Sequence, residues 1–398
     1  MRFLIINTDY PEFLGWLYDQ HPGLEQKSYD EQMRVRMESL FGVADFYSSN
    51  LRKLGHEAWD VHINNELMQR CWAREHGLLE GTASAIESGK AMLAHAERLA
   101  AQAPLRHLKP ILRPFFPSSN GKSACLYEIL AAQIRHYKPD VVLNQAMDSC
   151  FGRFLNDLKP DLQLLVGQIA SPLPQTEDFG CYDLIISSLP NFVDYFRSIG
   201  VAAELHRFGF EPEILGRLVE VEDPIPVSFV GSLSRDHASR IEWLETVCRL
   251  TPVEVWGDGL AGLSKQSWIR KRYKGTAWGI DMYRVLRRSK ITLNHHIGIA
   301  GAYANNMRLF EATGAGCLLI TDWKANLHEM FDLGKEVLCY RRPDECAEII
   351  QRILADEAKR QAISRAGHER TLRDHTYPRR AEELVDILEQ HLKPATGA

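Results

Sequence analysis

Residues 291–329 read ITLNHHIGIAGAYANNMRLFEATGAGCLLITDWKANLHE. The short apolar run at 291–293 predicts a buried strand, and the polar loop after it leads into helix-compatible spacing at 306–313. Two glycines are expected to end that helix before a second apolar run at 317–320. Strand, loop, helix and strand in this order form one unit of a parallel α/β sheet.

The loop between this strand and this helix is a predicted ligand site. Open α/β sheets bind ligands at the carboxyl ends of their strands, and the backbone N–H groups at a helix start favour phosphate. Glu311 lies inside the helix and is unsuited to phosphate, but its carboxylate can accept hydrogen bonds from vicinal sugar hydroxyls. Backbone N–H groups that favour phosphate, next to a carboxylate that accepts from sugar hydroxyls, therefore predict a nucleotide site.

The composition is that of an ordinary globular protein. The chain has 398 residues, 45% hydrophobic and 25% charged, which predicts two or three domains. A net charge of −5 gives no support to general nucleic-acid binding, which requires a basic surface. No apolar run suits a signal peptide or a membrane span, so we expect a cytoplasmic protein. The eight cysteines contain no CxxC pair, which predicts reduced core residues and no metal site.

The first half of the chain alternates expected strands and helices, as in a doubly wound domain. A long helix is expected at 31–54, and the segment at about 64–137 is interpreted as a helical insertion with a proline-containing loop. The predicted strands lie at 3–7, 57–61, 140–144, 163–166, 183–187 and 202–206. We place this domain at residues 1–210.

A second α/β series follows a linker at about 207–224, and two closely spaced prolines, Pro224 and Pro226, mark its end. We place the second domain at 211–375 and a last amphipathic helix within 376–398. The predicted strands of this domain lie at 227–231, 253–256, 291–293, 317–320 and 337–340.

Several residues after these strands are candidates for ligand binding. Arg235 follows the first strand of the second domain, where a guanidinium can bind phosphate in a bidentate manner. The run GDGLAG at 257–262 matches a pattern that can cradle a pyrophosphate, bring backbone close to another ligand, or form a plain turn. His295 and His296 are interpreted as loop residues near a substrate, because no carboxylate or histidine cluster at ligand spacing supports a metal.

The order of motifs at 306–322, NMRxxEAxGAGCLLITD, resembles the nucleotide-sugar domain of group 1 glycosyltransferases. It looks closest to the spore-maturation-protein-like subgroup, and the run at 208–212 resembles the hinge of this family. The resemblance covers about 207–390. It implies the GT-B fold, an α/β architecture with two doubly wound Rossmann-like domains facing across a cleft. The first domain would bind the acceptor, and the last helix would cross back to it.

The resemblance also implies roles for particular residues. The backbone around Asn306, with Arg308 or Arg235, would hold a diphosphate, Glu311 would bind the ribose, and the segment at 275–278 would lie beside the base. The predicted donor-binding residues are Gly231, Arg235, Trp256, Gly257, Gly275, Ala277, Trp278, His295, Asn305, Asn306, Met307, Arg308 and Glu311.

The implied activity is transfer of a sugar, most often UDP-linked in such enzymes, to a glycan, protein or small metabolite. No cofactor is expected. Many family members carry a glutamate eight positions before the equivalent of Glu311, where this chain has Tyr303, so the stereochemistry is left open. An inverting enzyme needs a base, for which Asp9 and Asp148, each after a first-domain strand, are candidates, although either could simply cap a turn.

Two other classes of function remain compatible with the sequence. A sugar-nucleotide epimerase or hydrolase shares the same fold, and fold alone does not fix function. A non-catalytic nucleotide-sugar-binding or structural protein is the second alternative. Product analysis without an acceptor would separate an epimerase or hydrolase from a transferase, and thermal-shift screening across nucleoside diphosphates would test the non-catalytic alternative.

Overall fold

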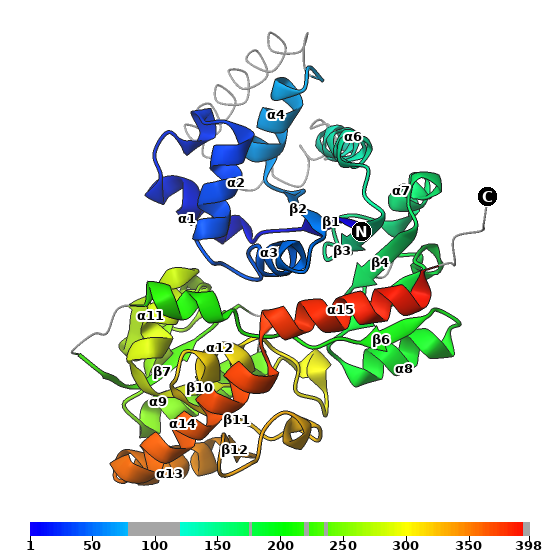
Figure 1. The fold of residues 1–398 in the computed structure, drawn as a ribbon. Helices are drawn as coiled ribbons and strands as arrows, with labels where there is room; N and C mark the ends of the chain where they lie inside the picture. The colour runs from blue at the N-terminus through cyan, green and yellow to red at the C-terminus, as the bar shows by residue number, and fades with distance from the viewer. Residues whose placement is uncertain (79–119, 175–176, 219–222, 235–237, 393–398) are drawn as a thin grey trace, which may run out of the picture. The chain divides into compact units, whose positions relative to one another are not determined.

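The computed structural model describes residues 1–78, 120–174, 177–218, 223–234 and 238–392. Two six-stranded sheets carry the fold, with strand orders β2-β1-β3-β4-β5-β6 and β12-β11-β10-β7-β8-β9 (Figure 1). The first sheet contains β1 Arg2–Asn7, β2 Glu57–His62, β3 Val141–Asn144, β4 Leu164–Gln168, β5 Leu184–Ser187 and β6 Ala203–Leu205. The second contains β7 Ile225–Val230, β8 Glu254–Trp256, β9 Tyr273–Gly275, β10 Ser289–Asn294, β11 Leu318–Asp322 and β12 Leu338–Tyr340.

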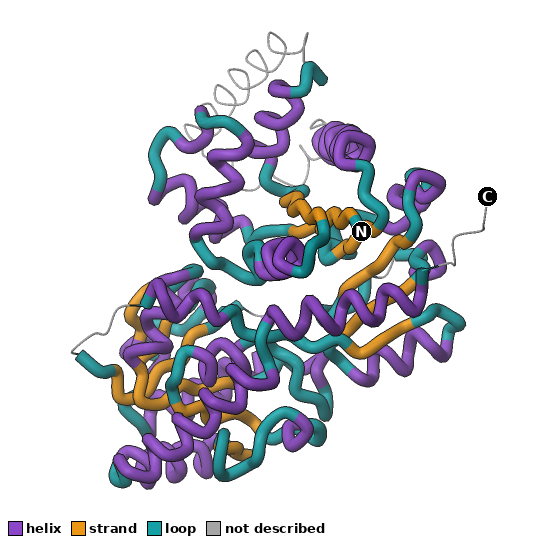
Figure 2. Tube along the Cα trace, in the orientation of Figure 1, coloured by secondary structure: helices purple, strands orange, loops and turns teal. Residues whose placement is uncertain are grey.

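Helices connect the strands, as the purple and orange segments of Figure 2 show. Those of the first half are α1 Pro11–Gln20, α2 Tyr29–Glu38, α3 Phe46–Lys53, α4 Glu66–Glu75, α6 Asn120–Tyr137, α7 Gly152–Asn156 and α8 Pro190–Ser198. Those of the second are α9 Ala238–Leu250, α10 Trp268–Arg272, α11 Ile280–Arg288, α12 Arg308–Gly314, α13 Pro343–Leu354, α14 Glu357–Asp374 and α15 Tyr377–His391. None of the described helices is both long and apolar enough to cross a membrane.

Side chains of the second sheet alternate between its two faces. Leu318 and Ile320 of β11 pack in the cluster formed with α9 and α13, whereas Leu319 between them packs in the cluster that contains α11 and α12. This period of two is the one expected of a strand buried on both faces. The alternation fixes which helices cover which face, so α12 lies on the face opposite α9.

Contacts divide the described chain into two units. One comprises Asn7–Val35 and Val61–Lys138, and the other comprises Met1–Ile6, Arg36–Asp60 and Pro139–Ala398, in both cases as far as they are described. The smaller unit has its own apolar cluster, which includes Met68, Trp72 and Ile129. The predicted domain boundaries at 210 and 375 are not tested by this division and stay predictions.

The predicted helix at 31–54 is wrong, because the chain turns between α2 and α3. Leu40, Gly42 and Ala44 have φ values of 59°, 61° and 41°, which a right-handed helix does not allow. The carbonyl of Ser39 accepts a hydrogen bond from the N–H of Ile280 at 2.8 Å, so a contact distant in sequence stabilises the turn. Within the predicted insertion, α4 and α6 are described, whereas residues 79–119, including most of the predicted loop, lie outside the described residues.

Phe210 in the predicted linker is anchored to two later parts of the chain. Its N–H donates to the carbonyl of His375 at 2.8 Å, and its carbonyl accepts from the N–H of Tyr377 at 2.9 Å. A Cβ on Gly314 would lie 2.2 Å from Cγ of Phe210, far inside van der Waals contact. Gly314 therefore ends α12 and also lets the aromatic ring of the linker reach this helix.

Candidate functional site

The carboxyl ends of the second sheet bring the predicted donor-binding loops to one edge. All pairings in this sheet are parallel, so the residues after each strand lie side by side in strand order. In sheet order, this edge carries Gly275 at the end of β9, Gly257 after β8, Gly231 after β7 and His295 after β10. The sequence thus located correctly several loops that the sheet places together, although it missed the short strand β9.

The glycines of the 257–262 motif serve the contact between two loops. A Cβ on Gly257 would lie 1.9 Å from the carbonyl oxygen of Gly231, and the N–H of Gly231 donates to the carbonyl of Trp256 at 3.0 Å. Gly259 has a φ of 90°, and a Cβ there would lie 2.8 Å from the carbonyl carbon of Leu233. The close backbone approach at this motif is therefore made to the β7 loop of the same domain, and the predicted approach to a ligand stays a prediction.

The side chain of Asn306 is hydrogen-bonded to the end of β10, the strand that precedes it in the chain. Its Nδ2 donates to Oδ1 of Asn294 at 2.6 Å, and Nδ2 of Asn294 donates back to Oδ1 of Asn306 at 3.3 Å. Asn294 also donates to Oγ1 of Thr321 at 2.9 Å. The expected helix begins at Arg308 and has seven residues, so its N-terminus is a weaker anion site than a long helix would offer.

Glu311 is buried, with 5% of its surface exposed. Its Oε2 lies 2.9 Å from a guanidinium nitrogen of Arg308, whose side chain is 13% exposed. Burial raises the pKa of Glu311, and the charge of Arg308 and a hydrogen bond with Tyr283 act in the opposite direction. A carboxylate has about four acceptor positions, so this pairing leaves capacity for further donors. The ribose role predicted for Glu311 stays a prediction.

The segment after β9 packs against another part of the same chain. The ring of Trp278 lies edge-on to that of Phe41, with centroids 5.2 Å apart. Ala277 and Trp278 are half-buried. Arg235, the predicted phosphate ligand of the β7 loop, lies outside the described residues.

A pocket of about 390 Å³ lies at the carboxyl ends of β10, β11 and β12. Of those predicted donor-binding residues that the structure describes, it contains only His295. The other polar residues that line it are Ser239, His296, Asp322, Lys324, Tyr340 and Arg341. Asp322, Lys324 and Tyr340 were not predicted. Asp322 lies two residues after the expected strand at 317–320, and Tyr340 ends the expected strand at 337–340, so the search of strand ends that found His295 would also have found both.

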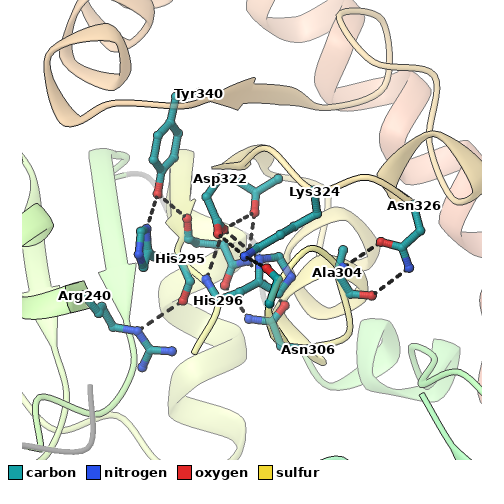
Figure 3. A network of polar contacts seen from close by, with 12 residues as sticks. Arg240, His295, His296, Ala304, Asn306, Asp322, Lys324, Asn326 and Tyr340 are labelled. Carbon is teal, nitrogen blue, oxygen red and sulfur yellow. Dashed lines mark hydrogen bonds and ion pairs between the residues drawn. The ribbon is translucent and has the colours of Figure 1, made fainter. Parts of the chain in front are cut away.

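Asp322 is the centre of the polar network in this pocket (Figure 3). Its Oδ1 accepts from the backbone N–H of His296 at 3.0 Å and from Nδ1 of the same residue at 2.6 Å. Its Oδ2 lies 3.3 Å from Nζ of Lys324, which donates to the carbonyl of Gly301 at 2.6 Å. Burial alone would raise the pKa of Asp322, but the hydrogen bond from His296 and the nearby charges together lower it below its usual value. The carboxylate is therefore ionised at neutral pH.

The protonation of His295 follows from its neighbour. The hydroxyl of Tyr340 donates to the carbonyl of Asn294 at 2.8 Å, so it accepts from Nδ1 of His295 at 3.0 Å. Burial lowers the pKa of His295 to about 4, so the ring is neutral and its Nε2 carries a lone pair. Trp243 stacks against both rings, with centroids 5.0 Å from His295 and 5.2 Å from Tyr340.

The two candidate bases occupy different environments. Asp9 is 3% exposed, and its Oδ2 lies 2.9 Å from Nδ1 of the buried His62. Asp148 is exposed in the loop after β3, where it accepts a hydrogen bond from Ser149 at 3.2 Å. Neither assignment is tested by these contacts. Access to a substrate favours Asp148, because a general base must reach the proton that it removes.

Comparison with known proteins agrees with the architecture. Residues 239–386 match a family model described as glycosyl transferase-like. A search of curated proteins finds no match. Similar solved structures include HepE of Anabaena in complex with UDP-glucose, with a TM-score of 0.58 and 10% identity over 98% of this chain and 100% of that chain. A glycosyltransferase of Rickettsia africae gives a TM-score of 0.56 and 10% identity over 99% of both chains.

The N-terminal domain of trehalose-6-phosphate phosphatase from Candida albicans is also similar, with a TM-score of 0.53 and 12% identity over 98% of this chain and 97% of that chain. At such identities the likeness establishes the fold and not the reaction. The predicted fold class is confirmed: the chain has the α/β GT-B architecture, with a glycosyl transferase-like segment at 239–386.

Proposed function

We propose that this protein is a glycosyltransferase that moves a sugar from a nucleotide diphosphate sugar to an acceptor. The observation that carries the proposal is the glycosyl transferase-like segment at 239–386, whose strand-end loops meet at one edge of a parallel sheet. Ligands of open α/β sheets bind at such an edge. The solved HepE and Rickettsia structures, both of this architecture, support the same class of reaction.

The finer features of the proposal rest on the sequence and, for the nucleotide, on a similar solved structure. UDP is the favoured carrier, because HepE, of the same fold, is known in complex with UDP-glucose. The base would lie beside 275–278, the ribose at Glu311, and the diphosphate at Asn305, Asn306, Met307 and Arg308. Positive charge from Arg308 would stabilise the leaving diphosphate without a metal ion. The likeness to the spore-maturation-protein-like subgroup belongs to this proposal and is equally open to test.

The chemistry breaks the bond between the anomeric carbon and the diphosphate and forms a new bond to an acceptor oxygen or nitrogen. If the product has inverted configuration, Asp148 is the favoured base. If configuration is retained, attack from the leaving-group face needs no such base. Product stereochemistry, measured by nuclear magnetic resonance, distinguishes the two, and Asp148→Asn abolishes turnover only in the inverting case.

Ligand binding and turnover test the proposal directly. A ligand that binds the folded state raises its apparent stability, so thermal-shift measurements across nucleoside diphosphates should identify the base. Mass spectrometry of each matching nucleotide sugar, with and without cell-extract glycans as acceptors, then follows release of the nucleoside diphosphate. Absence of both a shift and turnover would refute the proposal. Epimerised donor, or hydrolysis without transfer in the presence of acceptors, would reassign the protein to another class of the same fold.

A further inference from the structure

The pocket at the ends of β10–β12 has unused hydrogen-bonding capacity. Oδ1 of Asp322 accepts two hydrogen bonds from His296 and one from Thr321, whereas Oδ2 contacts only Nζ of Lys324 among the described residues. Nζ of Lys324 has three N–H groups, of which two are directed to Asp322 and Gly301. An acceptor and a donor thus remain side by side, which matches neighbouring hydroxyl groups that both donate and accept.

The other side of this pocket is also lined by side chains with hydrogen-bonding groups. Nε2 of His295 is a hydrogen-bond acceptor, because its proton lies on Nδ1 toward Tyr340. His296 also lines the pocket, and its Nε2 is buried without a hydrogen-bond partner among the described residues. A buried polar atom without a partner is unfavourable, so a hydrogen-bond partner for this nitrogen would stabilise the site. A volume of about 390 Å³ falls in the range typical of small-ligand sites.

The order of strands gives the direction in which a nucleotide sugar would lie. The segment proposed for the base follows β9, and the residues proposed for the ribose and diphosphate follow β10. Strands β8 and β7 lie between them, and β11 and β12 continue the same edge beyond β10. A donor with its base at the β9 end therefore directs its sugar toward β11.

We propose that this pocket holds the sugar of the nucleotide sugar, with Asp322 and Lys324 contacting its hydroxyls and His296 positioning the carboxylate of Asp322. The inference rests on the proposed function and adds the residues that select the transferred group. His296 contributes through two hydrogen bonds to one carboxylate oxygen, which leaves the other oxygen oriented toward Lys324.

The test compares the affinities of nucleotide and nucleotide sugar. Calorimetry is performed on the full chain with UDP, UDP-glucose, UDP-galactose and UDP-N-acetylglucosamine. We expect at least one UDP-sugar to bind more tightly than UDP. Asp322→Asn keeps an oxygen acceptor for His296 and replaces the second oxygen with a donor. Because a hydrogen bond to a charged group contributes about 1.5–3 kcal/mol, the preference for the UDP-sugar should fall about tenfold or more, with UDP affinity unchanged.

Two further variants keep the test independent of folding defects. Gly298 lines the pocket, and a Cβ there meets nothing within 4 Å, so Gly298→Leu should fill the space and remove the same preference. Asp332→Asn changes an exposed aspartate whose Oδ2 lies 2.8 Å from Nζ of Lys335, and as a matched control it should alter neither affinity. Circular dichroism establishes that each variant is folded.

Each other outcome overturns the inference in a distinct way. Equal affinity of the wild-type chain for UDP and every UDP-sugar, or an unchanged preference in both folded pocket variants, would refute a sugar site while donor binding stands. Loss of UDP affinity in Lys324→Met equal to the loss for the UDP-sugar would reassign the pocket to phosphate. Absence of binding to any of these probes, with no turnover of any donor, would refute the proposed function itself.

Discussion

Glu311→Ala is expected to cost both stability and nucleotide affinity. The substitution removes a carboxylate that is 5% exposed and leaves Arg308, 13% exposed in its side chain, without its partner at 2.9 Å. Removing one member of a buried ion pair typically costs about 3–5 kcal/mol. Because whole proteins are stable by only about 5–15 kcal/mol, the variant should be folded but far more sensitive to denaturant.

Urea unfolding measures the loss, and two variants separate its causes. Replacing both members, as Arg308→Met with Glu311→Leu, should recover most of the stability, because no charge is then left buried. Glu357→Ala removes a half-exposed glutamate that pairs with Arg360 at the same spacing, and should cost about 1 kcal/mol or less. A stability of Glu311→Ala equal to that of the wild type would refute the argument from burial.

Glu311→Gln tests the ribose role while preserving volume. The neutral amide keeps one oxygen acceptor but loses the charge, so a charge-assisted hydrogen bond to the ribose becomes an ordinary one. The affinity for UDP should fall about tenfold, measured by calorimetry at a temperature where the variant is fully folded. Unchanged affinity would show that the carboxylate serves only Arg308 and the packing around it.

Three other substitutions have defined outcomes. Gly257→Ala places a Cβ 1.9 Å from the carbonyl oxygen of Gly231 and should cost about 1–3 kcal/mol in denaturant unfolding. Trp243→Ala removes a core ring that is 5% exposed and should cost about 3–5 kcal/mol by the same measurement. Burial lowers the pKa of His206 to about 4, so stability is full above about pH 6.5 and falls toward pH 4, where the unfolded state alone gains the proton. His206→Gln keeps a donor for the carbonyl of Arg380 and should flatten that decline.

Other positions of the same protein provide matched control variants for these substitutions. Gly262 belongs to the same motif as Gly257, yet a Cβ there meets nothing within 4 Å, so Gly262→Ala should be nearly neutral. Equal effects of the two substitutions would contradict the steric argument. An identical decline of stability with pH in the wild type and in His206→Gln would show that other groups account for the acid sensitivity.

Sequence patterning predicted the strands of the second domain because each is a short apolar run that precedes glycine or polar residues. It missed β9, whose three residues include an exposed lysine and carry no periodic signal. It merged α2 and α3 because Leu40 and Ala44 have ordinary helical propensities, whereas the turn between them combines Gly42, whose φ is 61°, with the tertiary contact of Ser39 with Ile280. Local propensity has no access to such a contact.

The candidate site, like the fold, could be predicted from the sequence only in part. Residues that follow strands could be placed at one edge, since parallel topology requires it. The pairing of Glu311 with Arg308 could be anticipated from their spacing of three, but its burial could not. The pocket depends on Asp322 contacting His296, 26 positions earlier in the chain, and no pattern within either loop specifies that they meet.

Helix α15 has a consequence for how the protein is made. It packs against α3, and the ring of Tyr377 contacts Phe46 and Tyr47, with centroids 5.0 and 5.4 Å apart. Domains usually fold in the order in which they leave the ribosome. The first half of the chain covers part of α3, since Tyr47 also contacts His206, but the side that faces α15 gains its cover only when residues 377–391 have been synthesised. The nascent N-terminal half should therefore present this side of the two aromatic rings to chaperones throughout translation of the second domain.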